Sequence, residues 1–565
     1  MERGSLENLS FPPSFFVPEV REGFYVSEMM KRYHAAQLTV LSEIDRVCRK
    51  YNLPWYADNG TLLGTVRHGG YIPWDDDIDI CMMRHDMDRL FDVAEKELPE
   101  GYQVLNIRRN GYEYLLAQIT NGLSIGYAGE RLRDAHSCPY IIGIDIFAMD
   151  GAFRDREKEE RRCEGVSNAI VAAAMVKEGK INTTDCELLL QQIERQNNLR
   201  IDRKKHPRRQ LLALAEELSA MCSSEDAENV VYMQLFSEDR SHLYPKALFS
   251  GRVRMPFENT YLPVPARYDK VLQIEYGDFM RVFKGGGMHE YPVYDNQEQL
   301  LREKTGCHTG RYTLHREHLS LPPRASTRKD RIRQLTAVME KAQAQSEQLI
   351  AAGRQADAEQ LLLSCAPLLN ELDLLLSPKR EIVFLPVKAD WWNTMEPLYR
   401  AALTEENNSV TVIAVPYLEA EPDGSNPHPV DERDLFPKDL PLTAASGYDF
   451  GTRHPDMIVI QHPYDEWSMA VHLPEFFRSA NLRQMTDRLV YLPCHDADTP
   501  ADREGASAKA LRVLIEQPAV VNADEVIVRD EGMRALYIDT LTKIAGDDTR
   551  PLWEEKIKER SLFSF

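Results

Sequence analysis

Carboxylates and isoleucines alternate in the segment Asp75–Ile80 (DDDIDI), and this pattern constrains the fold more than any other in the chain. Side chains of a strand point to alternate faces, so an extended segment places Asp77 and Asp79 on one face and Ile78 and Ile80 in a core. Two carboxylates on one face repel each other unless a cation lies between them. The pair therefore predicts a site of hard oxygen ligands for Mg²⁺ or Mn²⁺.

The segments that precede this motif predict a helix, a strand and a second helix. Residues 30–50 place apolar side chains at helical spacing, and residues 55–57 have the composition of a short strand. Gly60 and Thr61 then open a short helix. The first turn of a helix presents unpaired backbone N–H groups, which suit a phosphate.

A second acidic strand is predicted over residues 141–151, where Asp145 stands in an otherwise apolar sequence. A carboxylate in a buried strand costs free energy unless it is paired or binds a metal. Beside Asp77 and Asp79 it would complete a three-carboxylate site; the alternative is a core carboxylate paired with Arg or Lys. Asp150 is expected to form a turn, and Asp75 and Asp76 are expected to be loop groups at the surface or behind the ligands.

The sequence from Gly60 to Asp79 resembles the signature of the LicD/fukutin-related phosphotransferase family, G-T-L-L-G-x-x-R-H-x-G-F-I-P-W-D-D-D-I-D, with Tyr71 at the usual Phe. Residues 145–150 are similar to the family's D-I-F-P-L-D, with Ala148 at the usual Pro. Residues 276–280 are similar to its closing Y-G-D-Y-M. The resemblance extends over about residues 30–299.

This resemblance implies a metal-dependent transferase with an α+β nucleotidyltransferase fold. Its donor would be a CDP-activated alcohol, typically CDP-choline, and its acceptor a hydroxyl of a cell-surface glycan or a teichoic-acid precursor. The implied residues are the metal ligands and catalytic carboxylates Asp77, Asp79 and Asp145, the donor-phosphate groups Gly60 and Thr61, and the charge-neutralising Arg67 and His68.

Gln118 marks a departure from the family pattern. Many relatives carry a Lys on the strand after the metal motif, whereas here the strand-like sequence Leu116–Ile119 has Gln118 at that place. We expect Gln118 to contact the substrate, and the loss of a cation to alter which donor is accepted or to weaken activity.

Composition divides the chain into three regions. Residues 1–320 would form the catalytic domain. Residues 327–376 have helical periodicity with a break at Gly353, which predicts a helical hairpin that serves as a linker or pairs two chains in a homo-oligomer. Residues 378–565 alternate apolar strand-like segments with helical ones, which predicts a Rossmann-like α/β domain. The predicted strands begin near Glu381, Val410, Met457, Leu489 and Glu525.

The third region resembles the amino-terminal half of CDP-glycerol glycerophosphotransferases over about residues 379–557. The resemblance lies in residues 455–467 and 483–493, together with Pro422–Gly424 and Phe436–Lys438. Those enzymes have a two-domain glycosyltransferase-B fold and bind the donor mainly in the other half, for which the chain offers no room. We therefore expect this region to bind acceptor glycan or a partner without transferase activity of its own.

Three polar residues of this region, His462, Asp465 and Glu466, follow a predicted strand. Ligands of α/β folds bind at the carboxyl ends of strands, so these residues are candidates for a binding site. The alternative is that they are loop residues without a catalytic role.

Charge and cysteine content exclude several classes of protein. The net charge of −21 argues against a nucleic-acid partner and against docking to anionic lipid through a basic surface. The nine cysteines show no C-x-x-C spacing, and neither a signal peptide nor a membrane-spanning apolar segment is recognised. A cytoplasmic protein is predicted, and a lipid-linked acceptor would be met at the inner membrane face.

Two other functions stay open. A true nucleotidyltransferase would leave a nucleotide on its acceptor and release pyrophosphate. A catalytically weak glycan-binding scaffold would account for Gln118 and for the missing half of the third region, but unpaired buried carboxylates would then cost stability without a function.

Overall fold

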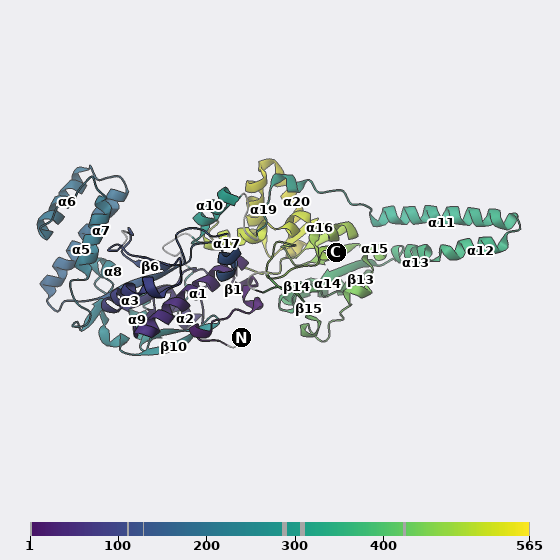
Figure 1. Cartoon of the computed structure of the whole chain (residues 1–565). Helices are drawn as coiled ribbons and strands as arrows, with labels where there is room; N and C mark the ends of the chain where they lie inside the picture. The colour runs from purple at the N-terminus through teal and green to yellow at the C-terminus, as the bar shows by residue number, and fades with distance from the viewer. Residues whose placement is uncertain are drawn as a thin grey trace. The chain divides into compact units, whose positions relative to one another are not determined.

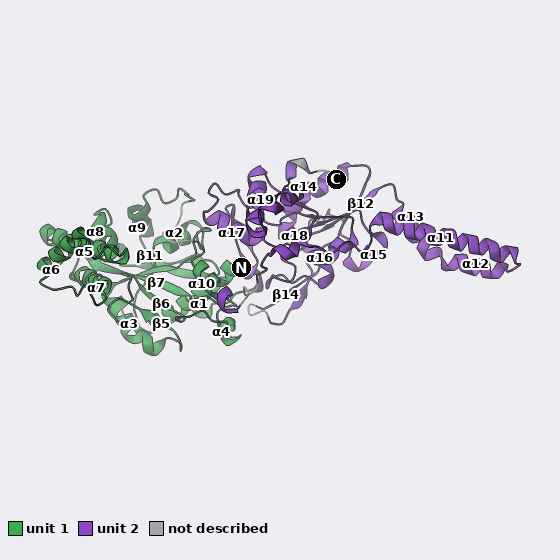
Figure 2. Ribbon diagram, turned by 90° about the horizontal axis from the view of Figure 1, so that it is seen from above, with its two compact units in different colours: residues 1–12, 29–300 green, residues 13–28, 301–565 purple. Residues whose placement is uncertain are grey.

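The chain folds into two compact units, which the computed structural model describes over residues 3–109, 112–127, 129–284, 291–305, 311–421, 425–563 and 565. The first unit comprises Met1–Pro12 and Met29–Leu300, and the second comprises Pro13–Glu28 and Leu301–Phe565 (Figure 2). Pro422–Gly424, which carry part of the second resemblance, lie outside the described residues.

A mixed sheet forms the centre of the first unit. Its strand order is β3 (Tyr56–Ala57), β4 (Asp79–Met83), β7 (Gly143–Gly151), β6 (Ala117–Thr120) and β5 (Gln103–Leu105). The end of β7 also pairs with β8 (Asn229–Val231), which pairs with β9 (Tyr244–Pro245). Strands β4 and β7 are parallel and the other pairs are antiparallel.

Several helices belong to this part of the unit, and two of them were expected from the sequence. The helix α1 (Glu28–Tyr51) buries the predicted apolar stripe, and α2 (Asn59–Arg67) follows β3 as expected. Next, α3 (Arg84–Glu97) follows β4 directly and packs on β4, β5 and β7. A short helix, α4 (Gly129–Asp134), precedes β7. A hairpin of β10 (Arg252–Phe257) and β11 (Thr260–Pro265) is followed by α9 (Tyr268–Tyr276).

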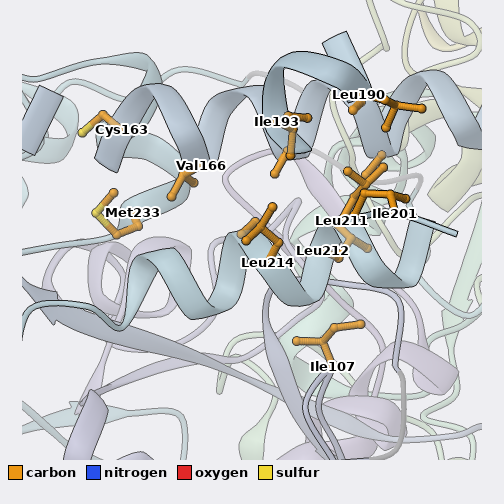
Figure 3. Packing of buried hydrophobic residues seen from close by; sticks show 14 of the residues in the cluster. Ile107, Cys163, Val166, Leu190, Ile193, Ile201, Leu211, Leu212, Leu214 and Met233 are labelled. Carbon is orange, nitrogen blue, oxygen red and sulfur yellow. The ribbon is translucent and has the colours of Figure 1, made fainter. Parts of the chain in front are cut away.

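A group of helices has its own apolar core within the first unit. These are α5 (Arg156–Lys177), α6 (Thr184–Asn197), α7 (Pro207–Ser219) and α8 (Met233–Glu238). Figure 3 shows Val166 of α5, Leu190 of α6, Leu214 of α7 and Met233 of α8 turned into this core. Asp155 and Thr183 cap the amino ends of α5 and α6 by accepting from backbone N–H groups of the first turn.

The second unit is built on a six-stranded parallel sheet. Its strand order is β13 (Asn408–Val412), β12 (Arg380–Leu385), β16 (Met457–Ile460), β17 (Arg488–Tyr491), β18 (Glu525–Val528) and β19 (Ile557–Glu559). All five predicted strands are present, and β19 is an additional one. The parallel sheet here and the mixed sheet of the first unit confirm the predicted α/β class.

Helices connect these strands and cover the sheet. They include α14 (Trp392–Thr404), α15 (Phe450–Arg453), α16 (Ser479–Leu482), α17 (Ala506–Ile515), α18 (Pro518–Asn522), α19 (Glu531–Ala545) and α20 (Arg550–Lys556). A small hairpin of β14 (Tyr417–Glu419) and β15 (His428–Val430) lies outside the main sheet, and α10 (Asp295–Thr305) crosses the boundary between the units.

Three helices occupy the region between residues 327 and 376. Helix α11 (Arg328–Ala351) lies alongside α12 (Gln355–Ser364) and α13 (Ala366–Leu375) (Figure 1). Gly353, with a φ of 73°, ends α11 as the sequence predicts. The second break falls between α12 and α13. Pro367 lies in the first turn of α13, where the backbone N–H groups have no partner within the helix, so the N–H that proline lacks costs no helical hydrogen bond.

An amino-terminal hairpin belongs to the second unit, although the composition gave no sign of it. Strands β1 (Glu19–Arg21) and β2 (Phe24–Val26) pair with each other, and β2 packs on α17. The hydroxyls of Tyr25 and Tyr464 are hydrogen-bonded. At the end of the segment, Glu28 accepts hydrogen bonds from Ser468 Oγ at 3.0 Å and Met469 N at 3.1 Å.

No helix in the described part of the chain is long and apolar enough to cross a membrane. The described cysteines are free thiols.

Candidate active site

Three carboxylates converge at the amino end of β4. One oxygen each of Asp77, Asp79 and Asp145 lies within 4.8 Å of the others. Asp79 and Asp145 are register partners on the parallel strands β4 and β7, so their side chains emerge side by side. The strand begins only at Asp79, so Asp77 reaches the group from the irregular segment before β4, whereas the sequence predicted that it lies on the strand.

Burial and mutual repulsion make this group costly to ionise. Burial first, and then the charges of Asp77 and Asp145, raise the pKa of Asp79 well above its usual value. The neighbouring isoleucines Ile78, Ile80, Ile144 and Ile146 are buried, as the alternation predicts. Three carboxylates whose oxygens can share one ion are the donor set that Mg²⁺ and Mn²⁺ prefer, so the group fits a hard divalent cation.

A cavity of about 670 Å³ opens over this group. Seven acidic residues and three arginines line its described part: Asp75, Asp77, Asp79, Asp145, Asp150, Glu216 and Asp278, with Arg67, Arg84 and Arg281. The excess of carboxylates would repel a phosphorylated ligand, so a phosphate-bearing substrate needs bound cations here.

Gln118 supports Asp145 from the neighbouring strand. The two residues are register partners on β6 and β7, and Gln118 Nε2 donates to Asp145 Oδ1 at 2.7 Å. Gly143 leaves room for this side chain, because a Cβ there would lie 2.5 Å from the Gln118 amide. Gln118 does not line the described cavity.

The first turn of α2 lies against a carboxylate. A Cβ on Gly60 would lie 2.3 Å from Asp75 Oδ2, so the Asp75 carboxylate covers the Cα of Gly60. The neighbouring Asp58, at the N-cap position, is buried and accepts from Tyr232 Oη at 2.8 Å. Burial raises the pKa of Asp58 to about 6.

Thr61 joins α2 to β4. Its buried hydroxyl accepts a hydrogen bond from the backbone N–H of Asp79 at 2.8 Å. The hydroxyl thereby fixes the start of the strand that carries the Asp79 carboxylate. Thr61 does not line the described cavity, so the phosphate contact expected from the sequence stays a prediction.

Arg67 and His68 lie at the carboxyl end of α2. Arg67 lines the cavity and donates to the carbonyl oxygens of Phe279 at 3.3 Å and Arg281 at 3.5 Å, and its Nε lies 2.9 Å from His68 Nε2. The His68 ring packs edge-on against Trp74, with ring centroids 6.2 Å apart, and does not line the described cavity.

Two further acids differ from their predicted surroundings. Asp150 is not a turn residue: it lies near the end of β7, is buried, and accepts two hydrogen bonds of 2.8 Å from Arg84. Arg84 also pairs with Glu216 of α7. Asp76 is fully buried and accepts from the backbone N–H of Val293 at 2.7 Å, so it is not a surface group.

Sequence reasoning missed Arg84, Glu216 and Arg281 as cavity residues. Arg84 is the first residue of α3, Glu216 comes from α7, and Arg281 follows α9, so only the fold brings them together. No local spacing signals these contacts.

The second-unit candidates follow β16. His462 and Asp465 are buried. Asp465 accepts hydrogen bonds from Ser479 N at 2.8 Å and from Ser479 Oγ at 2.5 Å. Glu466 is exposed and lies 3.9 Å from Arg478. These contacts give Asp465 a structural role within the unit.

Comparison with known proteins bears on the first unit. Residues 52–117 match the family model described as LicD/FKTN/FKRP, nucleotidyltransferase domain. Residues 52–117 carry a LicD-family domain sequence. The match covers α2, the acidic motif and β4, and it confirms the family resemblance over that segment.

Curated relatives also match part of this chain. The lipopolysaccharide cholinephosphotransferase LicD of Haemophilus influenzae is 35% identical over 115 residues, which is 20% of this chain and 42% of that protein. An uncharacterized protein of Rickettsia prowazekii is 35% identical over 83 residues, 14% of this chain and 31% of its own length. The chain thus spans less than half the length of the curated relatives that it matches.

Proposed function

We propose that this protein is a metal-dependent phosphotransferase that moves a phospho-alcohol from a CDP-activated donor, CDP-choline-like, to a hydroxyl of a cell-surface glycan or teichoic-acid precursor. The observation that carries the proposal is the convergence of Asp77, Asp79 and Asp145 in a cavity whose walls include the LicD-type sequence. The name of the Haemophilus influenzae relative, a lipopolysaccharide cholinephosphotransferase, supports the choice of donor and acceptor class.

In this proposal Asp77, Asp79 and Asp145 hold Mg²⁺ or Mn²⁺. A cation held by these three carboxylates would supply positive charge that favours transfer of a phosphoryl group. The hydrogen bond from Gln118 Nε2 to Asp145 Oδ1 would orient this carboxylate for a metal or for the proton of the acceptor hydroxyl. Gly60 and Arg67 line the cavity, so a donor bound there would lie beside both residues.

The cellular location and the partners of the enzyme are also part of this proposal. We expect it in the cytoplasm, meeting a lipid-linked acceptor at the inner membrane face, and without a nucleic-acid partner, because its net charge is −21. The second unit would bind acceptor glycan or a partner protein. Helices α11–α13 would pair between chains, since they expose Ile350, Leu363 and Leu369.

The decisive experiment measures CMP release from CDP-choline, CDP-glycerol and CDP-ribitol with Mg²⁺ or Mn²⁺. Metal-dependent CMP from one donor would identify the alcohol. Asp79→Asn should abolish release, because it removes a central ligand. Asp92→Asn, on the exposed side of α3, serves as the matched control and should retain full activity.

The product separates this reaction from its alternatives. A nucleotidyltransferase would release pyrophosphate from a nucleoside triphosphate instead of CMP from a CDP-alcohol. The transferase proposal would be overturned by two results together. One is no CMP release from any of the three donors, with or without candidate acceptor glycans, and the other is no Mn²⁺ binding in calorimetry.

A further inference from the structure

Three arginines line the described part of the cavity, and their interactions with the rest of the protein differ. Arg84 is buried between two carboxylates, pairing with Asp150 and Glu216. Its charge is therefore compensated within the protein, and moving it toward a ligand would take from the buried Asp150 carboxylate its two hydrogen bonds to Arg84, although Glu216 would keep Arg108 at 3.5 Å. Arg84 is a poor candidate for binding a substrate phosphate.

Arg67 is engaged with the backbone. Its guanidinium donates to the carbonyl oxygens of Phe279 and Arg281 and contacts His68. These bonds tie the segment after α9 to the carboxyl end of α2. Arg67 lines the cavity, but the N–H groups that make these bonds serve to position this segment.

Arg281 lies on the segment that Arg67 positions. It lines the cavity and is exposed, and its guanidinium carbon lies 4.7 Å from the centre of the Phe283 ring, which also lines the cavity. Stacking on an aromatic face leaves the in-plane N–H donors of a guanidinium available. No carboxylate of a described residue forms an ion pair with it.

The amino end of α2 is a poorer site for a phosphate than the sequence suggests. The Asp75 carboxylate lies over Gly60, so negative charge already occupies the place where a helix end would attract an anion. The Thr61 hydroxyl accepts from Asp79 N. A phosphate in this cavity therefore needs a cation from another element.

We infer that Arg281 binds the phosphate groups of the substrate in this cavity. The inference rests on the proposed function for the identity of the substrate, but its chemistry requires only a phosphate-bearing ligand beside the metal site. A planar guanidinium can donate two parallel hydrogen bonds to one phosphate, which a Lys at Gln118 could not do in the same way. Arg281 would supply the cation that the sequence lacks on β6.

The test is calorimetric titration of the full chain, loaded with Mn²⁺, with CDP and separately with inorganic pyrophosphate. Arg281→Gln should weaken binding of both probes by about ten- to a hundred-fold, the value of a hydrogen bond to a charged group. Arg281→Lys should recover part of the loss. Arg267→Gln, at an exposed position just before α9 and outside the described cavity lining, is the matched control and should bind as wild type.

Mn²⁺ affinity should be the same in all variants, which shows that the metal site and fold are intact. Wild-type affinity of Arg281→Gln for both probes would overturn the inference, as would a wild-type protein that binds Mn²⁺ but neither probe. If pyrophosphate binds in an Arg281-dependent way while CDP does not bind and no CMP is released, the phosphate site stands and the proposed donor is wrong.

Discussion

Gln118 Nε2 donates a hydrogen bond of 2.7 Å to Asp145 Oδ1, and the two residues face each other on adjacent antiparallel strands. The bond fixes the orientation of the third carboxylate, because it engages one oxygen and directs the other. Partners that orient ligands in this way tune metal sites. Gln118 thus contacts Asp145, and the contact with substrate expected from the sequence stays a prediction.

We predict that Gln118→Leu weakens Mn²⁺ binding by about 10- to 100-fold, the usual cost of losing such a partner. Leu has a similar size but no donor, so the Asp145 carboxylate would lose the hydrogen bond that orients it. Calorimetric titration with Mn²⁺ measures the effect without any substrate. Gln103→Leu on β5, whose amide bonds only to Gly101 O at 3.4 Å among the described residues, is the control. Equal Mn²⁺ affinity of Gln118→Leu and wild type would show that Asp145 needs no such support.

A second prediction concerns Thr61, which accepts a hydrogen bond from the buried N–H of Asp79. Thr61→Val keeps the shape but leaves that N–H unpaired, at a cost of about 1–3 kcal/mol in the free energy of unfolding. Urea denaturation measures the change. Thr65→Val is the matched control: Thr65 Oγ1 donates to the Thr61 carbonyl at 2.7 Å, and this carbonyl is also placed to accept within α2. Losses of equal size would contradict a special role for the Thr61 bond.

The convergence of the three carboxylates could be predicted from the sequence. Asp77, Asp79 and Asp145 do converge, because carboxylates that alternate with isoleucines have a defined face once their strands pair. The register of β4 against β7, however, is a long-range property. The start of β4 at Asp79 was also not evident, since an acidic loop and an acidic strand have the same local pattern.

Contacts between distant segments could not be predicted. Asp150 stands before a glycine and has the local signature of a turn, but pairing with Arg84 buries it inside the unit. Arg281 follows Asp145 by more than a hundred residues and reaches the same cavity through an irregular segment. Such positions depend on tertiary packing, which leaves no periodic trace in the sequence.

A third prediction follows from Asp465 in the second unit. Burial raises the pKa of this carboxyl to about 7, against 3.8 for the unperturbed group. The folded chain therefore binds more protons than the unfolded chain between these values, so stability falls as the pH rises through this window. From pH 5 to pH 8 the loss attributable to Asp465 is about 3 kcal/mol, at 1.36 kcal/mol per pKa unit.

Asp465→Asn should remove this loss, because an amide carries no charge at any pH. Asn also tolerates the φ of 49° at this position and can still bond to Ser479. Urea denaturation of both proteins at pH 5 and pH 8 gives their free energies of unfolding. Relative to wild type, the free energy of unfolding of the variant should be higher at pH 8 than at pH 5. Asp434→Asn, at an exposed position, should follow the wild-type profile. Parallel pH profiles for wild type and Asp465→Asn would refute the prediction.

The last prediction concerns the turn that joins β1 to β2. Arg21 and Phe24 are register partners, so Glu22 and Gly23 form a two-residue loop, with φ values of 48° and 77°. Positive φ at both positions is the mark of a type I′ hairpin turn. Gly23 also lies against Asp498, whose backbone N–H donates to the Gly23 carbonyl at 2.7 Å.

Gly23→Ala should destabilise the second unit for two reasons. The left-handed conformation costs a residue with a Cβ about 1–2 kcal/mol, and the new Cβ would lie 1.9 Å from Asp498 Oδ2. Displacing that carboxylate also disturbs its ion pair with Arg529 at 3.2 Å. Gly179→Ala isolates the first of these costs, because Gly179 has a φ of 75° and a Cβ there would have no atom of the described chain within 4 Å. Differential scanning calorimetry should show a larger loss of Tm for Gly23→Ala; equal losses would mean that the hairpin moves freely on the second unit.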